Sequence, residues 1–376
     1  MEIEDYLRRM VERGASDLFF SAGAPVQVKV EGVLAPLEAE VLDGARVRKL
    51  AYALMSAEQR AEFERDLEQN LGVSLPGLGR FRVNVYRQRG ETAMVVRFLR
   101  SRIPDLEELG LPGRLRDLAM AVRGLVLVVG PTGSGKSTTL AAMIEQRSRN
   151  DACHILTIED PIEYVHAHGR SIVDQREVGL DTRSYEAALK NALREAPDVI
   201  LIGEIREAAT MRSALAYAET GHLCLSTLHA NNAEQALERI VSFFPEDAHR
   251  QLYLDLSLNL RAIVSQRLVR GVDGRRAAAV ELLLVSSYVE ELIRRGAFDG
   301  LREAMTRGAQ EGMQTFDEAL FELYRAGRIA REEALRYADS HNDLALRIRL
   351  AEGGGLEALG PQAGRLRLED PDAGST

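Results

Sequence analysis

The stretch LVLVVGPTGSGKSTT, residues 125–139, decides the fold of the larger part of this 376-residue chain. The apolar run 125–129 is typical of a buried strand, and the stretch after the glycines has helical composition. Residues 130–137 match the pattern G-x-x-x-x-G-K-[ST] between a strand and a helix, which is the setting of a phosphate-binding loop. The sequence therefore predicts a mostly parallel sheet with a nucleotide site at this loop.

Each residue type in this loop has a chemical reason. Gly133 and Gly135 let the backbone curl so that successive N–H groups point at one anion, and the following helix adds its positive end. We expect Lys136 to reach the β- and γ-phosphates and the hydroxyl of Ser137 to ligate Mg²⁺. The predicted ATP-contacting residues are Gly130, Pro131, Thr132, Gly133, Ser134, Gly135, Lys136, Ser137 and Thr138.

Acidic residues follow two other apolar runs. The run DVILIGE ends in Glu204, which we expect to hold or orient the Mg²⁺ shell. Glu159, Asp160 and Glu163 follow the run ILTI, and ligands bind at the carboxyl ends of strands in such sheets. One of the three could be a general base for water attack, or the cluster could be a solvated acidic loop. Composition alone does not rank these three carboxylates.

Two histidines lie at opposite ends of the run HLCLSTLH. If this run is a strand, His222 and His229 are roughly 23 Å apart. Two imidazoles at that separation cannot share a metal ion, whose bonds to nitrogen are about 2 Å long. His229 belongs to the end of the strand where a nucleotide binds, so we expect unequal roles for the two residues.

The chain divides into regions that differ in composition and in hydrophobic pattern. Residues 1–100 show alternating strands and helical stretches typical of a small α+β domain, and the Pro- and Gly-containing segment 101–113 indicates a linker. Residues 114–286 alternate apolar strands with helices, which predicts a core with helices on both faces. Residues 287–350 are predicted to be helical, and the tail 351–376 to be disordered.

Bulk composition excludes some functions. The net charge is −9 and the sequence pI near 5.5, which argues against a nucleic-acid-binding protein or nucleic-acid motor. The longest apolar strand-like run is far too short to cross a membrane, and MEIEDYLRRM has no apolar signal core. We therefore expect a cytoplasmic protein without direct membrane insertion.

Several motifs, in order, resemble those of the PilT/PilU-type retraction ATPases of type IV pili, in the secretion ATPase superfamily. GASDLFFSAG (14–23) is similar to the N-terminal signature of that family, and GRFRVNVYRQRG (79–90) to its arginine-bearing hairpin. ILTIEDPIEY (155–164) resembles the Asp box and DVILIGEIRE (198–207) an atypical Walker B motif. TGHLCLSTLHANNA (220–233) resembles the His box.

The resemblance implies roles for individual residues. Glu163 would polarise the attacking water, and Glu204 would act through Mg²⁺. His229 would face the γ-phosphate, with His222 in support. The resemblance also implies that Arg82 and Arg97, which alternation alone leaves open as solvated residues, contact the nucleotide.

The family resemblance implies the fold and the assembly. It predicts a small PAS-like α+β domain, a RecA-like P-loop domain with C-terminal helices, and a homohexameric ring. In this family the domains rotate during the ATP cycle, so a hinge would lie at 101–113. The implied partners are a PilT-type ATPase and the inner-membrane pilus platform protein, which would place the chain peripherally at the inner membrane.

Features of the branch refine this expectation. With two cysteines, the chain cannot form the four-cysteine zinc site of assembly ATPases. LFFSAG (18–23) and the segment 311–350 resemble PilU, whereas VEELIRRG (289–296) departs from the corresponding PilT helix. This favours a PilU-like accessory retraction motor, and the alternative is a nucleotide-dependent adaptor with little hydrolysis of its own.

Overall fold

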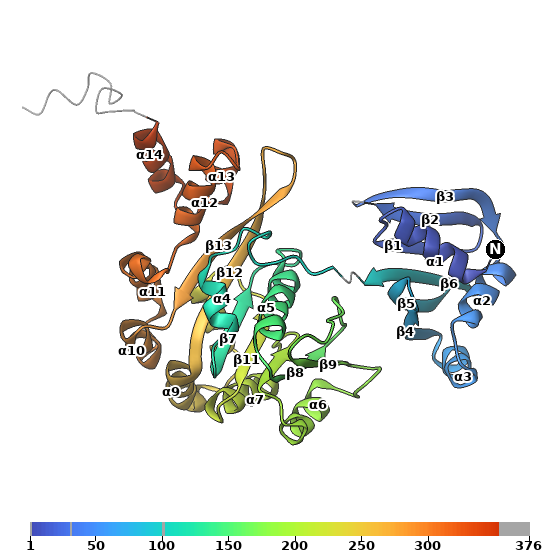
Figure 1. Ribbon diagram of the computed structural model, residues 1–376, viewed down its shortest axis with the longest axis horizontal. Helices are drawn as coiled ribbons and strands as arrows, with labels where there is room; N and C mark the ends of the chain where they lie inside the picture. Colours follow the sequence, from blue (N-terminus) through green and yellow to red (C-terminus); the bar gives the residue numbers. More distant parts are fainter. Residues whose placement is uncertain (1, 31, 100–101, 353–376) are drawn as a thin grey trace, which may run out of the picture.

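The computed structural model describes residues 2–30, 32–99 and 102–352 (Figure 1). It contains a six-stranded sheet in the first hundred residues and a seven-stranded sheet in the larger body that follows. This is the α/β architecture that the sequence predicts. The predicted disordered tail, 351–376, lies outside the described residues apart from its first two positions.

The N-terminal domain is an antiparallel sheet with strand order β3-β2-β1-β6-β5-β4. Its core includes Tyr6 and Met10 of the first helix, which are buried against the sheet. A tight turn joins β5 to β6, with positive φ at Arg89 and Gly90, the geometry that favours a two-residue hairpin. The elements are α1 (Ile3–Glu12), β1 (Asp17–Phe20), β2 (Ala24–Val30), β3 (Val33–Leu42), α2 (Gly44–Ala53), α3 (Ala57–Asp66), β4 (Glu68–Leu75), β5 (Gly79–Gln88) and β6 (Glu91–Leu99).

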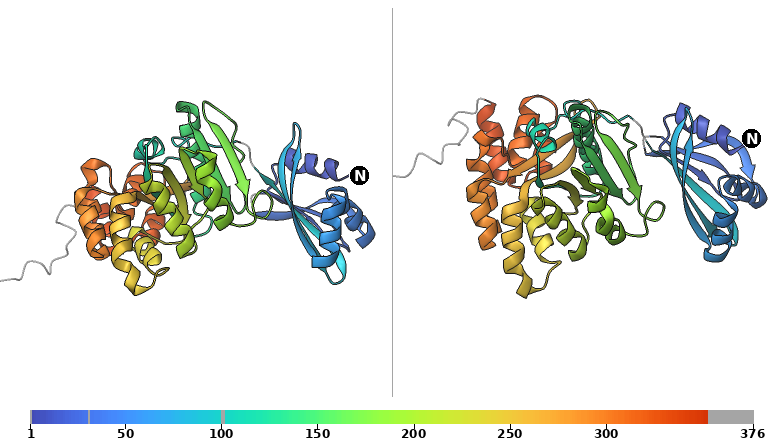
Figure 2. Two further views of the ribbon diagram at one scale, coloured as in Figure 1. Left: turned by 90° about the horizontal axis from the view of Figure 1, so that it is seen from below. Right: turned by 60° about the horizontal axis from the view of Figure 1, so that its bottom comes forward.

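The larger body has strand order β13-β12-β7-β11-β10-β8-β9, and all neighbouring pairs are parallel except β12 and β13. Helices cover both faces of the sheet (Figure 2). Its α-helices and strands as far as the last strand are α4 (Arg114–Ala119), β7 (Gly124–Val129), α5 (Lys136–Asn150), β8 (His154–Glu159), β9 (Ile172–Glu177), α6 (Tyr185–Ala192), β10 (Val199–Ile202), α7 (Ala208–Glu219), β11 (Leu223–Leu228), α8 (Ala233–Val241), α9 (His249–Asn259), β12 (Leu260–Arg270) and β13 (Arg276–Leu284).

Strand β7 lies inside this sheet, between β11 and β12. Leu125, Leu127 and Val129 belong to the apolar cluster on one face, and Val126 and Val128 to the cluster on the other. Burial on both faces explains why the run is apolar throughout and does not alternate.

Two strands in this body are absent from the sequence-based interpretation. β9, IVDQRE, is an edge strand with mostly polar side chains, and β12 carries Ser265, Gln266 and Arg267 in its middle. Polar residues inside a strand remove the apolar signal on which the prediction rests. In β12 these side chains bind neighbouring loops, as described below.

The segment predicted as a linker, 101–113, packs on the larger body from Ile103 onward. Ile103, Leu106 and Leu111 are buried in the cluster that also contains Val126 of β7. The prolines and glycines of this predicted linker mark turns, while the apolar residues between them anchor the chain to the larger body.

The C-terminal helices, orange to red in Figures 1 and 2, extend from the end of β13. The last three pack with Val269 and Ala279 of the β12–β13 pair in an apolar cluster of their own. Thr315 and Glu318 form a capping box at the start of one of these helices, since each side chain binds the other residue's backbone N–H. The helices are α10 (Ser287–Arg295), α11 (Leu301–Arg307), α12 (Phe316–Arg325), α13 (Arg331–Tyr337) and α14 (His341–Ala351).

Glu281 is a buried carboxyl on β13. It accepts hydrogen bonds from the backbone N–H of Ala233 at 2.8 Å and from Ser265 Oγ at 2.9 Å. Burial raises its pKa from 4.5 to about 7, because these two donors offset only part of the lost hydration. The folded protein therefore prefers the protonated form over a range where the unfolded chain is ionised.

Glu281→Gln should change how stability depends on pH. Below pH 4.5 both states of wild type are protonated; between 4.5 and about 7 the unfolded state alone loses the proton, which favours unfolding. We expect the unfolding free energy of wild type minus that of the variant to fall as pH rises from 5 to 7, and then to level off. Urea titrations would show this, with Glu246→Gln, at an exposed carboxyl, as control; a constant difference would contradict it.

Candidate nucleotide-binding site

The phosphate-binding loop follows β7 and lies directly against β12. A Cβ at Gly130 would lie 2.5 Å from the carbonyl oxygen of Gln266, and one at Gly135 would lie 2.9 Å from its side-chain nitrogen. Gly133 and Gly135 have φ of 79° and 92°, in the left-handed region that favours glycine. Thr139 Oγ1 also donates to Gln266 Oε1 at 2.8 Å. The glycine positions are thus set both by backbone conformation and by the neighbouring strand.

Lys136 is the first residue of α5 and turns back over its own loop. Its Nζ donates to the carbonyl oxygens of Gly130 at 2.8 Å and Pro131 at 3.0 Å. Burial lowers the pKa of this ammonium, and the nearby carboxylates of Glu204 and Glu163 oppose that shift. A phosphate in the loop would offer Nζ a charged partner in place of neutral carbonyls.

A cavity of about 540 Å³ opens beside this loop at the carboxyl ends of the strands. Its wall brings together the predicted residues Thr132, Gly133, Gly135, Lys136, Ser137, Thr138, Glu163, Glu204 and His229. Gly130 and Pro131 line an adjoining cavity that also reaches His229, and Ser134 lines a third beside the loop. The volume is of the size that small-molecule ligands occupy.

Glu204 follows β10 and has one unsatisfied oxygen. Arg206 binds its Oε1, whereas the buried Oε2 has no hydrogen-bond partner and lies 3.6 Å from His229 Nε2. A buried carboxylate oxygen without a donor is costly, and a cation in the cavity would remove that cost. Mg²⁺ commonly uses one or two carboxylates together with substrate phosphates and water, and Ser137 lines the same cavity.

The three carboxylates after β8 have different environments. Glu159 is partly buried, accepts hydrogen bonds from Thr157 and Gln175, and has its pKa raised by desolvation. Asp160 and Glu163 are exposed residues on the cavity wall. Only Glu163 of the three is close enough to Lys136 to act on its pKa. All three carboxylates line the cavity, but Glu159 is held by protein donors whereas Asp160 and Glu163 are exposed.

The two histidines have the unequal settings that their spacing predicts. His229 directly follows β11 and lines the cavity, and burial together with the charge of Lys136 lowers its pKa, which favours neutral imidazole. His222 precedes the same strand, where its Nδ1 lies 3.1 Å from Tyr217 O and 3.1 Å from Thr220 Oγ1. Within the described ranges, no group of three His, Cys, Asp or Glu is arranged to hold a metal ion.

Arg82 and Arg97 lie in the N-terminal sheet and are not among the residues that line the cavity. They are directly opposite each other on β5 and β6. Arg97 Nε donates to the buried carboxylate of Asp17 at 2.8 Å. Facing cations repel each other, and Asp17 supplies a single negative charge, so this pair of strands has a local excess of positive charge.

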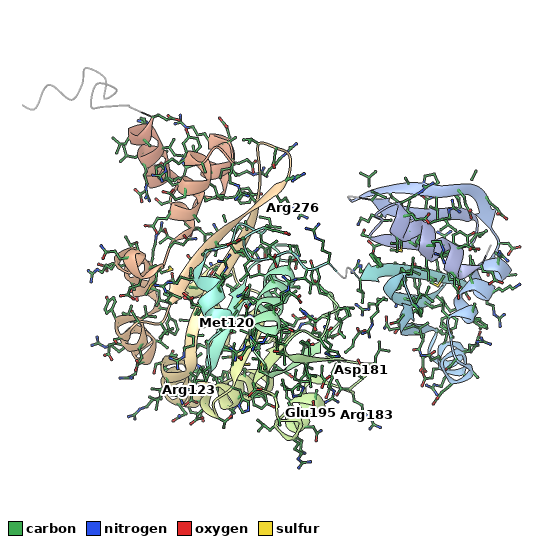
Figure 3. All side chains as sticks on the ribbon, in the orientation of Figure 1. Met120, Arg123, Asp181, Arg183, Glu195 and Arg276 are labelled. Atoms are coloured by element: carbon green, nitrogen blue, oxygen red, sulfur yellow. The ribbon has the colours of Figure 1, made fainter. Side chains whose placement is uncertain are left out.

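Several residues on the cavity wall had no sequence prediction. Tyr164 hydroxyl lies 2.8 Å from Thr138 Oγ1, and Tyr185 hydroxyl is buried without a hydrogen-bond partner. Arg206 binds Glu204. Leu268 of β12 and Arg276, which is the first residue of β13 (Figure 3), also line the wall. Tyr164 and Arg206 fall inside the quoted motifs, but Tyr185 and Arg276 come from segments with no local signal.

Comparison with known proteins agrees with this geometry. Residues 2–336 match the family model described as "Type II/IV secretion system protein". The chain belongs to this family. It is 52% identical to the type IV pilus ATPase PilU of Pseudomonas aeruginosa over 99% of this chain and 98% of that protein. Identity to PilT of the same organism is 41%, over 89% of this chain and 97% of that protein. The chain is thus an ATPase of the PilT/PilU type, with more similarity to PilU, as the motifs predict.

Solved structures of the family show the same fold. A crystal structure of the pilus retraction motor PilT with bound ADP superposes with a TM-score of 0.86 at 41% identity, covering 92% of this chain and 99% of that chain. The Legionella pneumophila ATPase DotB gives a TM-score of 0.73 at 25% identity. The two-domain architecture is therefore common to these secretion ATPases, and the family binds nucleotide.

Gly203→Ala tests how tightly the Glu204 side of the cavity is packed. A Cβ at Gly203 would lie 2.8 Å from Tyr185 hydroxyl and 3.2 Å from Glu159 Cα. We expect a loss of about 1–3 kcal/mol of stability from overpacking, with reduced ATPase activity because Glu204 is the next residue.

The variant Gly203→Ala/Tyr185→Phe, which removes the nearest atom, should recover part of both losses in urea unfolding and phosphate-release assays. Gly113→Ala is the matched control, because no atom lies within 4 Å of the added methyl group and φ is −57°. Equal losses in the single and double variants would show that the hydroxyl contact is not the cause.

Proposed function

We propose that this chain forms a homohexameric ATPase motor that drives type IV pilus retraction as a PilU-like accessory to a PilT-type motor. The observation that carries the proposal is that Glu204, whose buried Oε2 has no hydrogen-bond partner, lines one cavity together with the phosphate-binding loop, Glu163 and His229. Similarity to PilU over nearly the whole chain supports the biological setting.

In the proposed reaction, water attacks the γ-phosphorus of ATP. The water oxygen forms the new bond to phosphorus, the bond from the γ-phosphorus to the β–γ bridging oxygen breaks, and the water proton passes to Glu163. Lys136 and the loop N–H groups stabilise the phosphate charge. Neutral His229 donates a hydrogen bond to a γ-phosphate oxygen. The products are ADP and phosphate.

Ser137 and Glu204 are the residues that would hold Mg²⁺. When bound, the ion would supply charge neutralisation for the β- and γ-phosphates. Ser137 contributes a hydroxyl from the first turn of α5, and Glu204 contributes the oxygen that has no protein donor. Arg206 holds the other oxygen of Glu204 and thereby orients the carboxylate.

The hexamer proposal rests on two arginines of the N-terminal domain that do not line the cavity. Phosphoryl transfer often uses an arginine from a neighbouring domain or subunit. The facing pair Arg82 and Arg97 has an excess of positive charge and lies in the other domain. Closing the N-terminal domain onto a nucleotide, in the same subunit or the next, would bring these arginines to the phosphates.

The proposed partners are a PilT-type ATPase and the inner-membrane pilus platform protein. No helix within residues 2–30, 32–99 and 102–352 is both long and apolar enough to cross a membrane. We therefore propose that the chain works in the cytoplasm and reaches the inner membrane through these partners.

A nucleotide-dependent adaptor with little hydrolysis is the second candidate. It is favoured by the departure from PilT at VEELIRRG, which forms α10 with Val289, Leu292 and Ile293 buried. Tight ATP binding by the pure protein, without phosphate release, would support the adaptor over the motor.

Glu163→Gln and Lys136→Ala should fail at different steps. We expect Glu163→Gln to bind a fluorescent ATP analogue as wild type does, while kcat falls by at least about 100-fold through loss of the base. Lys136→Ala should lose most of its affinity for the analogue. Wild-type turnover in Lys136→Ala would refute the site, and weak binding by Glu163→Gln would assign that residue a structural role.

The ring can be tested by native mass spectrometry. With a non-hydrolysable ATP analogue and Mg²⁺, we expect a particle of about 250 kDa, which is six chains of 41.6 kDa. A monomer under these conditions would refute the hexamer. The same measurement on Arg97→Ala reports whether this arginine is needed for nucleotide-dependent assembly.

A further inference from the structure

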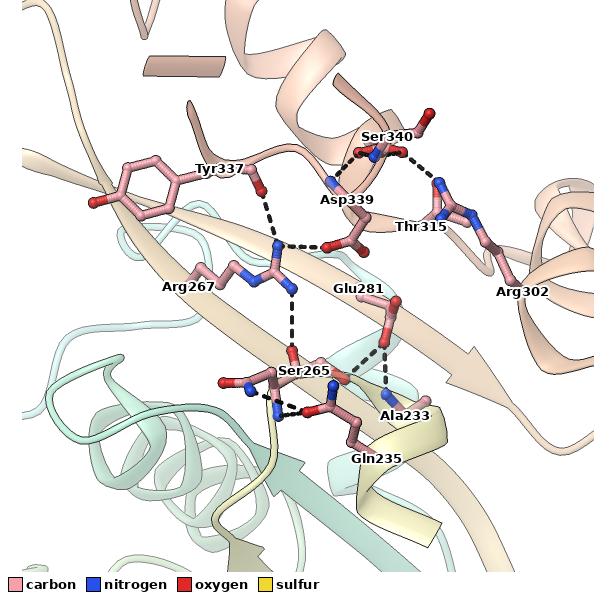
Figure 4. Close-up of polar contacts among 12 residues, drawn as sticks. Ala233, Gln235, Ser265, Arg267, Glu281, Arg302, Thr315, Tyr337, Asp339 and Ser340 are labelled. Atoms are coloured by element: carbon pink, nitrogen blue, oxygen red, sulfur yellow. Dashed lines mark hydrogen bonds and ion pairs between the residues drawn. The ribbon is translucent and has the colours of Figure 1, made fainter. Parts of the chain in front are cut away.

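Arg267 on β12 joins two segments that lie far apart in the sequence (Figure 4). One terminal nitrogen donates to Tyr337 O and to Asp339 Oδ1, each at 2.8 Å. The other lies 3.4 Å from the carbonyl oxygen of Asn231. A single guanidinium therefore connects the end of α13 with the loop that follows His229.

Packing also fixes the orientation of this guanidinium. Its central carbon lies 3.8 Å from the centroid of the Phe316 ring, and its side chain is only 17% exposed. A planar fork stacked on an aromatic ring has a defined orientation, which a lysine ammonium would not share. Displacement of the 337–339 segment would consequently displace the donor that holds Asn231.

Glu281 binds the chain at the C-terminal end of the same loop. Its Oε1 accepts from the backbone N–H of Ala233, the first residue of α8, and from Ser265 on β12. Residues 230–232, which follow His229, are thus held by Arg267 in the middle and by Glu281 at the end. The orientation of His229 depends on where this loop is held.

Strand β12 also holds the phosphate-binding loop. Gln266 accepts from Thr139, while Ser265 and Arg267, on the opposite face of the strand, reach Glu281 and Asn231. Consecutive residues of one strand therefore fix the position of the phosphate loop relative to the loop that carries the histidine.

We propose that Arg267 is a positioning residue for ATP hydrolysis. It holds the loop 230–232, and through it His229, in register with the phosphates, and it makes that register depend on the docking of residues 337–339 of the C-terminal helical part. The inference rests on the proposed phosphate-facing role of His229. It gives the C-terminal helices a direct connection to the hydrolysis step.

The test is a double-mutant cycle between Arg267→Met and His229→Ala, with kcat and KM measured by phosphate release. We expect Arg267→Met to lower kcat by about 10- to 100-fold, the effect of a small misplacement, and to change KM by less than about threefold. Added to His229→Ala, it should lower kcat by less than about twofold further, because both changes disable the same contact.

Two further variants separate positioning from general stability. Arg267→Lys keeps the charge without the fork and should recover only part of kcat, and Asp339→Ala should lower kcat without raising KM. Arg347→Met is the matched control: Arg347 of α14 also stacks on a phenylalanine, with its central carbon 4.4 Å from the ring centroid of Phe321. Among the described residues, no hydrogen bond or ion pair joins Arg347 to the loop after His229 or to residues 337–339. We expect near wild-type kcat for it at a similar thermal midpoint.

The outcomes distinguish the phosphate-facing role of His229 from the positioning role of Arg267. Unchanged kcat in His229→Ala would overturn the phosphate-facing role on which the inference rests. If His229→Ala is impaired, then wild-type kcat in Arg267→Met, or independent additive losses in the double variant, would overturn the positioning role alone. An equal loss in Arg347→Met would assign the effect to stability of the C-terminal helices.

Discussion

The contact between the phosphate-binding loop and strand β12 is the constraint on which the site depends. Gly130 and Gly135 lie so close to Gln266 that no side chain fits between the loop and the strand. The loop can then curl around one anion, while the amide of Gln266 holds Thr139 in the first turn of α5. Sheet, loop and helix are consequently one rigid support for phosphate, and the cavity residues are positioned relative to it.

Burial sorts the charged residues that the motifs bring together. Glu159 and Glu163 belong to one motif, yet the first is partly buried and held by Thr157 and Gln175, whereas the second is exposed near Lys136. The hydrogen-bonded carboxyl is fixed in place, and the exposed one is available to a water molecule. His222 is likewise partly buried and close to polar partners, whereas His229 is exposed on the cavity wall.

The sequence is informative where one strand must be apolar on both faces. It predicts β7, β10 and β11 and the residues at their ends for that reason. It fails for β12, because Gln266 binds Thr139 of α5 and Arg267 binds the loop after His229, and only the folded chain places these partners beside the strand. It also fails for Tyr185, whose place on the cavity wall depends on packing against Gly203. Contacts between distant segments leave no local pattern to read.

The anchoring of the chain by Ile103 onto the larger body sets how far the N-terminal domain can travel. Between Leu99 and Ile103 the backbone can span at most about 14 Å. A tether this short keeps a domain at an effective concentration in the millimolar range or above, relative to the surfaces that it reaches. In the proposed motor, Arg97, two residues before Leu99, therefore needs only a weak contact with the nucleotide to engage repeatedly. Weak contacts release quickly, and a cycle that must reset after each turnover benefits from quick release.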